Sequence, residues 1–190
     1  MRINPMTAVL LVLSVVVAGL LGQFRDSAIE DFQKTATLGE ALELDNQQTI
    51  TPLEISFGQF AVEGGGRRSV LSPERLVAVR FEFSTPFEDE LDGVRCFLRM
   101  AGGSIGEALD DGNLRFPHPG FRSTGTVVFE VTRQNLLGAR IACVPTGVIV
   151  YREPELLMSL GVDAGNVDTI WAQSSYRRVR WVEPTLEVIR

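Results

Sequence analysis

The sequence predicts an all-β fold: an antiparallel β-sandwich preceded by one N-terminal transmembrane helix, with a short helical segment near the C-terminus. Three observations support this. Residues 5–24 carry no charge, short segments between residues 53 and 151 alternate apolar and polar side chains, and residues 153–173 do not alternate. A chain of 190 residues suits one well-buried domain plus an appendage.

The N-terminal apolar segment predicts a membrane anchor. A spanning helix needs about 20 apolar residues, and residues 5–24 supply that length. Cleavage as a signal peptide is the alternative, although such signals have apolar regions of about 7 to 15 residues. The best cleavage site, before Gly19, falls inside the apolar run, and Gln23 stands where a lipoprotein signal would have its cysteine. We therefore expect the segment to be retained.

The charges on either side of the anchor predict its orientation. Arg2 precedes it, whereas Arg25 after it is offset by three acidic residues. Because cytoplasmic flanks carry the excess of positive charge, the C-terminal part should lie outside the cell. We expect a single-pass protein of the cell membrane with three parts: a cytoplasmic N-terminus and transmembrane helix at 1–24, a juxtamembrane neck at 25–50, and an extracytoplasmic sandwich domain at 51–190.

A period of two predicts the strands. Leu53, Ile55 and Phe57 alternate with polar residues, and Phe60 and Val62 continue in the opposite parity. This slip at Gly58-Gln59 predicts a β-bulge. The clearest strand holds the alternating apolar residues from Val77 to Phe83. Further strands are expected at 94–100, 126–131, 140–144 and 148–151, and within 179–188. Short strands separated by Gly, Pro and Asp are typical of an antiparallel sandwich.

A helical segment is expected near residues 153–173. Val167, Ile170 and Trp171 share a helical face there, and Asp163 can cap its start.

The two cysteines are candidates for a disulfide. Cys96 is in register with Val94 and Leu98, and Cys143 with Ile141, so both should point into the sandwich. Inward cysteines on two strands of an exported domain are well placed to pair. Two buried free thiols are the alternative, because parity does not establish distance. In either case their role is structural.

Two further motifs could carry chemistry. Gly102–Gly106 matches the G-x-S-x-G pattern of a hydrolase nucleophile elbow around Ser104. The only histidine is His118, and no α/β-hydrolase core fits around the pair, so a hairpin loop is expected and an envelope hydrolase is the weakest hypothesis. The acidic segments 88–92 and 110–113 lack calcium-loop spacing. We expect no catalytic site, no metal and no cofactor.

A resemblance to a known family lies in residues 120–145, GFRSTGTVVFEVTRQNLLGARIACVP. The Thr-Gly-Thr, the strand after it and the later Leu-x-Gly-Ala resemble telokin-like, immunoglobulin-type accessory domains of Gram-positive extracytoplasmic membrane-anchored proteins and lipoproteins. The resemblance implies an immunoglobulin-like, non-catalytic sandwich used for interaction, and it supplies no site residues. The chain departs from the family in having an apolar helix in place of a lipid-modified cysteine, and in its extension beyond Arg152.

The charge of the chain bears on its partners. The net charge is −6 and there is no basic stripe, the closest approach being Arg177, Arg178 and Arg180. Binding to nucleic-acid phosphates depends on clustered Lys and Arg. We therefore expect no nucleic-acid partner.

These observations predict an interaction protein, not an enzyme. We expect an accessory subunit or scaffold of a membrane or cell-envelope complex, whose partners are the bilayer and a membrane or envelope protein. The candidate interaction residues are Leu156, Leu157, Leu160 and Trp171. The alternative for these residues is packing against their own domain. The alternative function is a module that binds a small molecule, glycan or lipid in a groove between sheet and helix.

Overall fold

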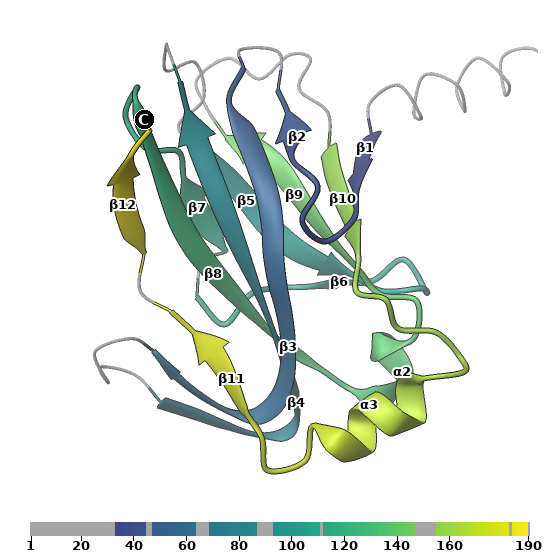
Figure 1. Ribbon diagram of the computed structural model, residues 1–190. Helices are drawn as coiled ribbons and strands as arrows, with labels where there is room; N and C mark the ends of the chain where they lie inside the picture. Colours follow the sequence, from purple (N-terminus) through teal and green to yellow (C-terminus); the bar gives the residue numbers. More distant parts are fainter. Residues whose placement is uncertain are drawn as a thin grey trace, which may run out of the picture. The chain divides into compact units, whose positions relative to one another are not determined.

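The protein is described from a computed structural model. The described residues are 33–44, 47–63, 69–86, 93–110, 112–146, 155–182 and 184–189. Residues 34–190 form one compact unit, in which two sheets pack as a β-sandwich (Figure 1). The expected transmembrane helix and the start of the expected neck lie outside the described residues. In the part of the chain that is described, no helix is long and apolar enough to cross a membrane.

The first sheet has the strand order β1-β10-β9-β5-β6, and β7 also pairs with β5. Its strands are β1 (Gln33–Ala36), β5 (Gly93–Arg99), β6 (Ile105–Gly106), β7 (Asn113–Arg115), β9 (Arg140–Thr146) and β10 (Glu155–Ser159). On β5, Val94, Cys96 and Leu98 are buried in the main core, as the alternation of this segment predicts.

The second sheet has the strand order β11-β3-β4-β8-β12, and β2 also pairs with β3. Its strands are β2 (Leu42–Glu43), β3 (Thr49–Glu63), β4 (Ser69–Thr85), β8 (Phe121–Val131), β11 (Arg178–Trp181) and β12 (Thr185–Val188). The strand expected around Val77–Phe83 is confirmed within β4, with Val77, Val79, Phe81 and Phe83 buried in the main core. β11 runs parallel to β3, which is a departure from the wholly antiparallel sandwich that the sequence predicts.

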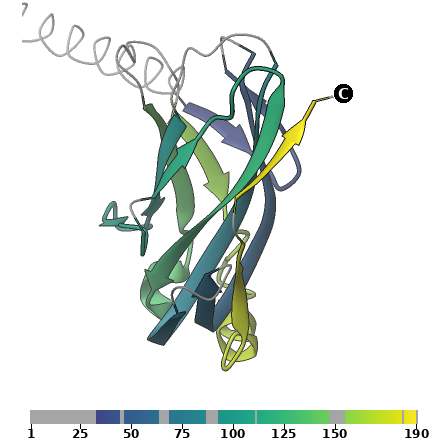
Figure 2. The same cartoon turned by 90° about the vertical axis from the view of Figure 1, so that its left-hand side faces the viewer.

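A β-bulge divides β3 into two parts. The register of β3 against β4 shifts between Gly58 and Phe60, so the predicted bulge is confirmed. Beyond the bulge, residues 60–63 of β3, residues 69–71 of β4 and the strand β11 form what we call the distal sheet, at the lower left of Figure 1. Figure 2 shows β11 beside the lower ends of β3 and β4 from a second direction.

The distal sheet covers a second hydrophobic cluster. Its inner side contributes Ala61, Val179 and Trp181, which pack with Val70 and with residues of β4 and β8. These β4 and β8 residues are Leu76, Ala78 and Val128. In a strand, neighbours of core-facing residues point to the opposite side of the sheet. The long strand β4 therefore buries both of its faces, one in the main core and one under the distal sheet.

The folded domain begins earlier than the sequence predicts. Residues 25–50 were expected to form a neck, but β1 and β2 lie within this range and Leu44 is buried in the main core. The assignment of residues 33–44 and 47–50 to the neck is therefore wrong. Strands of four and two residues are too short to show a period-two pattern against polar surroundings.

Glu40 closes the turn between β1 and β2. Its Oε2 accepts hydrogen bonds from the backbone N–H of Thr37 at 3.0 Å and from the Thr37 hydroxyl at 2.9 Å. These bonds favour the charged carboxylate and hold the pKa of Glu40 below its ordinary value of 4.5.

The C-terminal extension is part strand and part helix. The helix expected near 153–173 is confirmed only as α3 (Val167–Gln173), and residues 155–159 form β10 instead. Leu156, Leu157 and Met158 are all buried. Because these three consecutive apolar residues show no alternation, the run does not reveal its period. A single helical turn, α2 (Arg133–Leu136), is capped by the Thr132 side chain.

Candidate functional site

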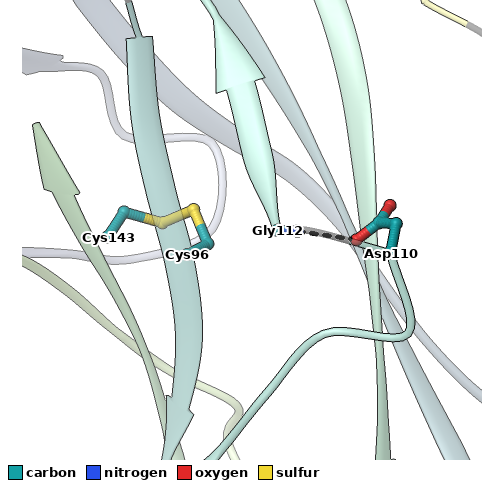
Figure 3. Close-up of a disulfide and its surroundings, with 4 residues drawn as sticks. All are labelled: Cys96, Asp110, Gly112 and Cys143. Atoms are coloured by element: carbon teal, nitrogen blue, oxygen red, sulfur yellow. Dashed lines mark hydrogen bonds between the residues drawn. A yellow bond between two sulfur atoms is a disulfide. The ribbon is translucent and has the colours of Figure 1, made fainter. Parts of the chain in front are cut away.

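The predicted disulfide is confirmed. Cys96 and Cys143 are bonded, and their Cα atoms lie 4.1 Å apart at directly opposed positions of β5 and β9 (Figure 3). The N–H of Cys96 donates to the carbonyl of Gly112 at 2.8 Å, on the side of β5 away from β9. The cysteines thus occupy a non-hydrogen-bonded pair, where antiparallel Cα atoms approach to about 4.5 Å. The bond joins two strands of one sheet and lies in the main core.

Three of the four predicted interaction residues are buried. Leu156, Leu157 and Leu160 are buried, and Leu156 and Leu160 belong to the main core. For these three leucines, the structure shows packing against their own domain, as the alternative predicts. Trp171 packs against the core and lies under the guanidinium of Arg75, and part of its surface stays exposed.

Ser104 and His118 are not brought together. Ser104 lies in the turn between β5 and β6, and its hydroxyl donates to the Met100 sulfur at 3.3 Å. His118 follows β7, which pairs with the opposite end of β5. Segment 102–106 is part of a hairpin, as predicted.

The acidic turn at residues 110–113 has a local structural role. Asp110 accepts a hydrogen bond from the N–H of Gly112 at 3.0 Å (Figure 3). Over the described ranges, no group of three or more His, Cys, Asp or Glu side chains gathers as a metal site requires.

An exposed apolar surface lies on the distal sheet and the loop after α3. Tyr176 is 96% exposed, Leu71 76% and Phe60 37%. We call these three residues the distal patch. Together with Gln59, Ser72 and Pro73 they line an open depression of about 540 Å³. Clustered exposed apolar side chains are a property of interaction surfaces, whereas single ones are ordinary.

Strand register explains why the distal patch faces outward. Phe60 pairs with Leu71 of β4 on one side and with Arg178 of β11 on the other. The adjacent row, which joins Ala61 to Val70 and Val179, lies in the second hydrophobic cluster. Since successive side chains alternate between faces, the row containing Phe60 must point away from that cluster.

The loop that presents Tyr176 is fastened to the β-bulge. The carbonyl of Arg177 accepts hydrogen bonds from the N–H groups of Gln59 at 2.9 Å and Phe60 at 3.2 Å. The N–H of Tyr176 donates to Oε1 of Gln59 at 2.9 Å. The bulge thus supplies two backbone donors and one side-chain acceptor to a loop more than a hundred residues away in sequence.

A buried arginine holds the other end of this loop. Arg75 is only 7% exposed, and its Nε donates to the Trp171 carbonyl at 3.1 Å and to Oγ of Ser174 at 2.9 Å. Its Nη2 donates to Oγ of Ser175 at 2.6 Å, and Cζ lies 4.5 Å from the Trp171 ring centroid. A buried charge is costly unless its donors are satisfied, and here carbonyl and hydroxyl oxygens and an aromatic face satisfy it.

Tyr176 itself has a strained backbone. Its φ is +57°, a left-handed conformation that costs a non-glycine residue about 1–2 kcal/mol. Its side chain is almost fully exposed, so burial of the ring does not offset this cost. The fold therefore holds the backbone of Tyr176 in a fixed conformation and presents its aromatic side chain to solvent.

Sequence reasoning missed the distal patch. The parity slip at Gly58 was a partial signal, because it predicts the bulge beyond which Phe60 pairs with Leu71 instead of a main-core residue. No comparable signal marks Tyr176, whose neighbours come together only through the fold.

The apolar cavity between the sheets leaves little space for a ligand. An apolar cavity between the sheets, lined by residues that include Ile50, Phe81 and Leu156, measures about 10 Å³. This volume is no more than one water molecule needs.

Solved structures similar to this chain include two bacterial proteins. One is the yjhA protein from Bacillus subtilis, 12% identical, with 65% of this chain and 97% of that chain covered at a TM-score of 0.46. Another is an uncharacterized β-sandwich protein from Clostridium difficile 630, 11% identical, with 67% of this chain and 94% of that chain covered at a TM-score of 0.44. No protein-family model and no curated protein matches the chain.

Proposed function

We propose that this chain is a membrane-anchored, extracytoplasmic interaction protein, an accessory subunit or scaffold of a membrane or cell-envelope complex that docks through the distal patch. The observation that carries the proposal is Tyr176, an exposed aromatic residue held in a strained backbone conformation. Such strain persists where the surroundings impose it, and it concentrates at binding sites. Tyr is also among the residues that dominate binding energy in interfaces.

The distal patch and β1 lie at opposite ends of the sandwich. β1, which follows the expected anchor and neck in the chain, lies at the upper end of the sandwich in Figures 1 and 2. The distal sheet lies at the lower end.

The immunoglobulin-like classification expected from the sequence fits this proposal. Such sandwiches are rigid supports for loops at their two ends. The alternative, a module that binds a small molecule, glycan or lipid, has no comparable support, because the apolar cavity between the sheets is too small for such ligands.

The test is affinity purification of the full-length tagged protein from its native host in mild detergent, with partners quantified by mass spectrometry. We expect Leu71→Ser and Tyr176→Gly each to reduce recovery of a stoichiometric partner by about tenfold or more, as substitutions at interface centres do. Tyr176→Gly should leave the unfolding temperature unchanged or raise it, since glycine adopts positive φ without strain. If Tyr176→Gly loses the partner but keeps its unfolding temperature, the loss is due to docking and not to unfolding.

A matched control is Leu186→Ser. Leu186 is 62% exposed on β12 and lies outside the distal patch, so this variant should recover the partner normally. Equal recovery with all three variants, or recovery of the protein alone while other membrane complexes in the extract stay intact, would refute the proposal.

A further inference from the structure

The distal patch is bordered by positive charge. Arg178 pairs with Phe60 in the parallel register of β11 and β3, so the two side chains emerge side by side on the outward face. Arg177 follows Tyr176 directly in the chain and is also exposed. Arg180, two residues further along β11, projects on the same face as Arg178.

Arg177 and Arg178 have no carboxylate partner among the described residues. Exposed arginines elsewhere commonly do: Arg95 pairs with Glu107, Arg122 with Glu187 and Arg133 with Asp168. On β11 itself, Arg180 contacts Glu54 at 3.4 Å. Arg177 adjoins Tyr176 in the chain and Arg178 lies opposite Phe60 in the register, so both are available to an acidic group that approaches the distal patch. The net charge of the chain is −6.

On the basis of the proposed function, we infer that the distal patch recognises a partner protein through a segment that presents an apolar or aromatic side chain flanked by carboxylates. The apolar side chain packs on Phe60, Leu71 and Tyr176. The carboxylates pair with Arg177 and Arg178, whose planar guanidinium groups suit two-point contact with a carboxylate. Complementary charge of this kind fixes orientation and excludes wrong partners.

A protein segment fits the site better than a lipid headgroup does. Basic and aromatic side chains together also suit the surface of an anionic bilayer. Such surfaces, however, attract clusters of about four to eight basic residues, whereas two unpaired arginines border this patch, in a chain whose net charge is −6. Anionic lipid is therefore an alternative outcome of the test and not the expected one.

The experiment measures direct binding to the full-length protein in detergent by fluorescence anisotropy. The probes are three labelled peptides with one apolar centre: DEDFLDED, KKKFLKKK and SSSFLSSS. We expect DEDFLDED to bind at least about tenfold more tightly than the other two at low salt, and its affinity to fall as salt rises. The double variant Arg177→Glu/Arg178→Glu should abolish this preference.

Arg140→Glu is the matched control. Arg140 is an exposed arginine of β9, in the other sheet, and no ion pair of it is seen within the described residues. This variant should bind DEDFLDED as the wild type does. A parallel assay uses vesicles of equal parts phosphatidylglycerol and phosphatidylcholine.

Three results would overturn the inference: no binding of DEDFLDED, equal binding of the three peptides, or binding to the vesicles without a preference for DEDFLDED. Failure of the inference is distinguishable from failure of the proposed function. If partner recovery from the native host depends on Tyr176 and Leu71 but is unchanged by Arg177→Glu/Arg178→Glu, docking through the patch stands and the acidic partner is excluded.

Discussion

At the scale of single residues, Gly58 at the β-bulge leaves no room for a side chain. A Cβ added there would overlap the carbonyl oxygen of Arg177, which is already bound by the N–H groups of Gln59 and Phe60. We expect Gly58→Ala to lower the free energy of unfolding by about 2–4 kcal/mol, in the range of severe steric substitutions. Chemical denaturation measures this change.

The matched control for that substitution is Gly102→Ala. A Cβ at Gly102 meets no atom within 4 Å, and its φ is not positive, so this variant should stay within about 0.5 kcal/mol of the wild type. An equal loss of stability in both variants would show that the contact of Gly58 with Arg177 is not the cause.

Residues on a regular strand could be placed from the sequence, and residues in irregular segments could not. Parity alone placed Cys96 and Cys143 inside, and the structure adds that they are directly opposed. Tyr176 was beyond prediction, because its position depends on Gln59 and Arg75, each about a hundred residues away in the chain. Hydrogen bonds over such separations leave no periodic trace in the sequence.

At the scale of elements, Arg75 is the tie between β4 and the end of α3. Replacing it with Leu removes the donors to the Trp171 carbonyl and to the two serine hydroxyls. We expect Arg75→Leu to cost about 1–3 kcal/mol and to speed amide hydrogen exchange at residues 174–177 more than in the main core. Hydrogen exchange with mass spectrometry measures both regions.

A suitable comparison is Arg133→Leu, because Arg133 also contacts α3, through Asp168, but on the surface. Exposed ion pairs contribute about 0–1 kcal/mol, so this variant should leave exchange at residues 174–177 unchanged. If both arginine variants speed amide exchange at residues 174–177 equally, Arg75 does not hold this loop more firmly than Arg133 does.

Elements whose apolar and polar residues alternate were predictable, and an element with an unbroken apolar run was not. β4 and β5 were recognised from alternation. β10 was mistaken for helix because Leu156, Leu157 and Met158 are all buried, which removes the polar half of the period. The bulge in β3 was visible as a parity slip, yet only the fold shows that the strand beyond it covers a second hydrophobic cluster.

At the scale of the whole molecule, the disulfide closes a loop that passes through both sheets. The cysteines are 47 residues apart, and the chain between them runs from β5 through β8 of the second sheet and back to β9. On the chain-entropy model such a loop stabilises the folded state by about 4 kcal/mol. We expect the oxidised protein to unfold at a correspondingly higher denaturant concentration than protein reduced in denaturant and kept under dithiothreitol.

The double variant Cys96→Ala/Cys143→Ala serves as the second measurement. Its free energy of unfolding should match that of the reduced protein, apart from the loss caused by removing two buried sulfur atoms. Equal unfolding midpoints for the oxidised and reduced forms would show that the bond contributes nothing to stability.

The fold class was predictable because many short alternating strands admit few arrangements other than a sandwich. The strand order was not, since the sequence says which face of a strand is buried but not which strand lies beside it. The parallel pairing of β11 with β3 illustrates this, because the two strands are more than a hundred residues apart in the chain.

The length of β3 and β4 has a mechanical consequence. These two strands run from the end of the sandwich near β1 and β2 to the distal sheet, and they are hydrogen-bonded along most of that path. A force that pulls the two ends of the sandwich apart would load this ladder along its strands. Its hydrogen bonds would then resist shear together instead of opening one after another.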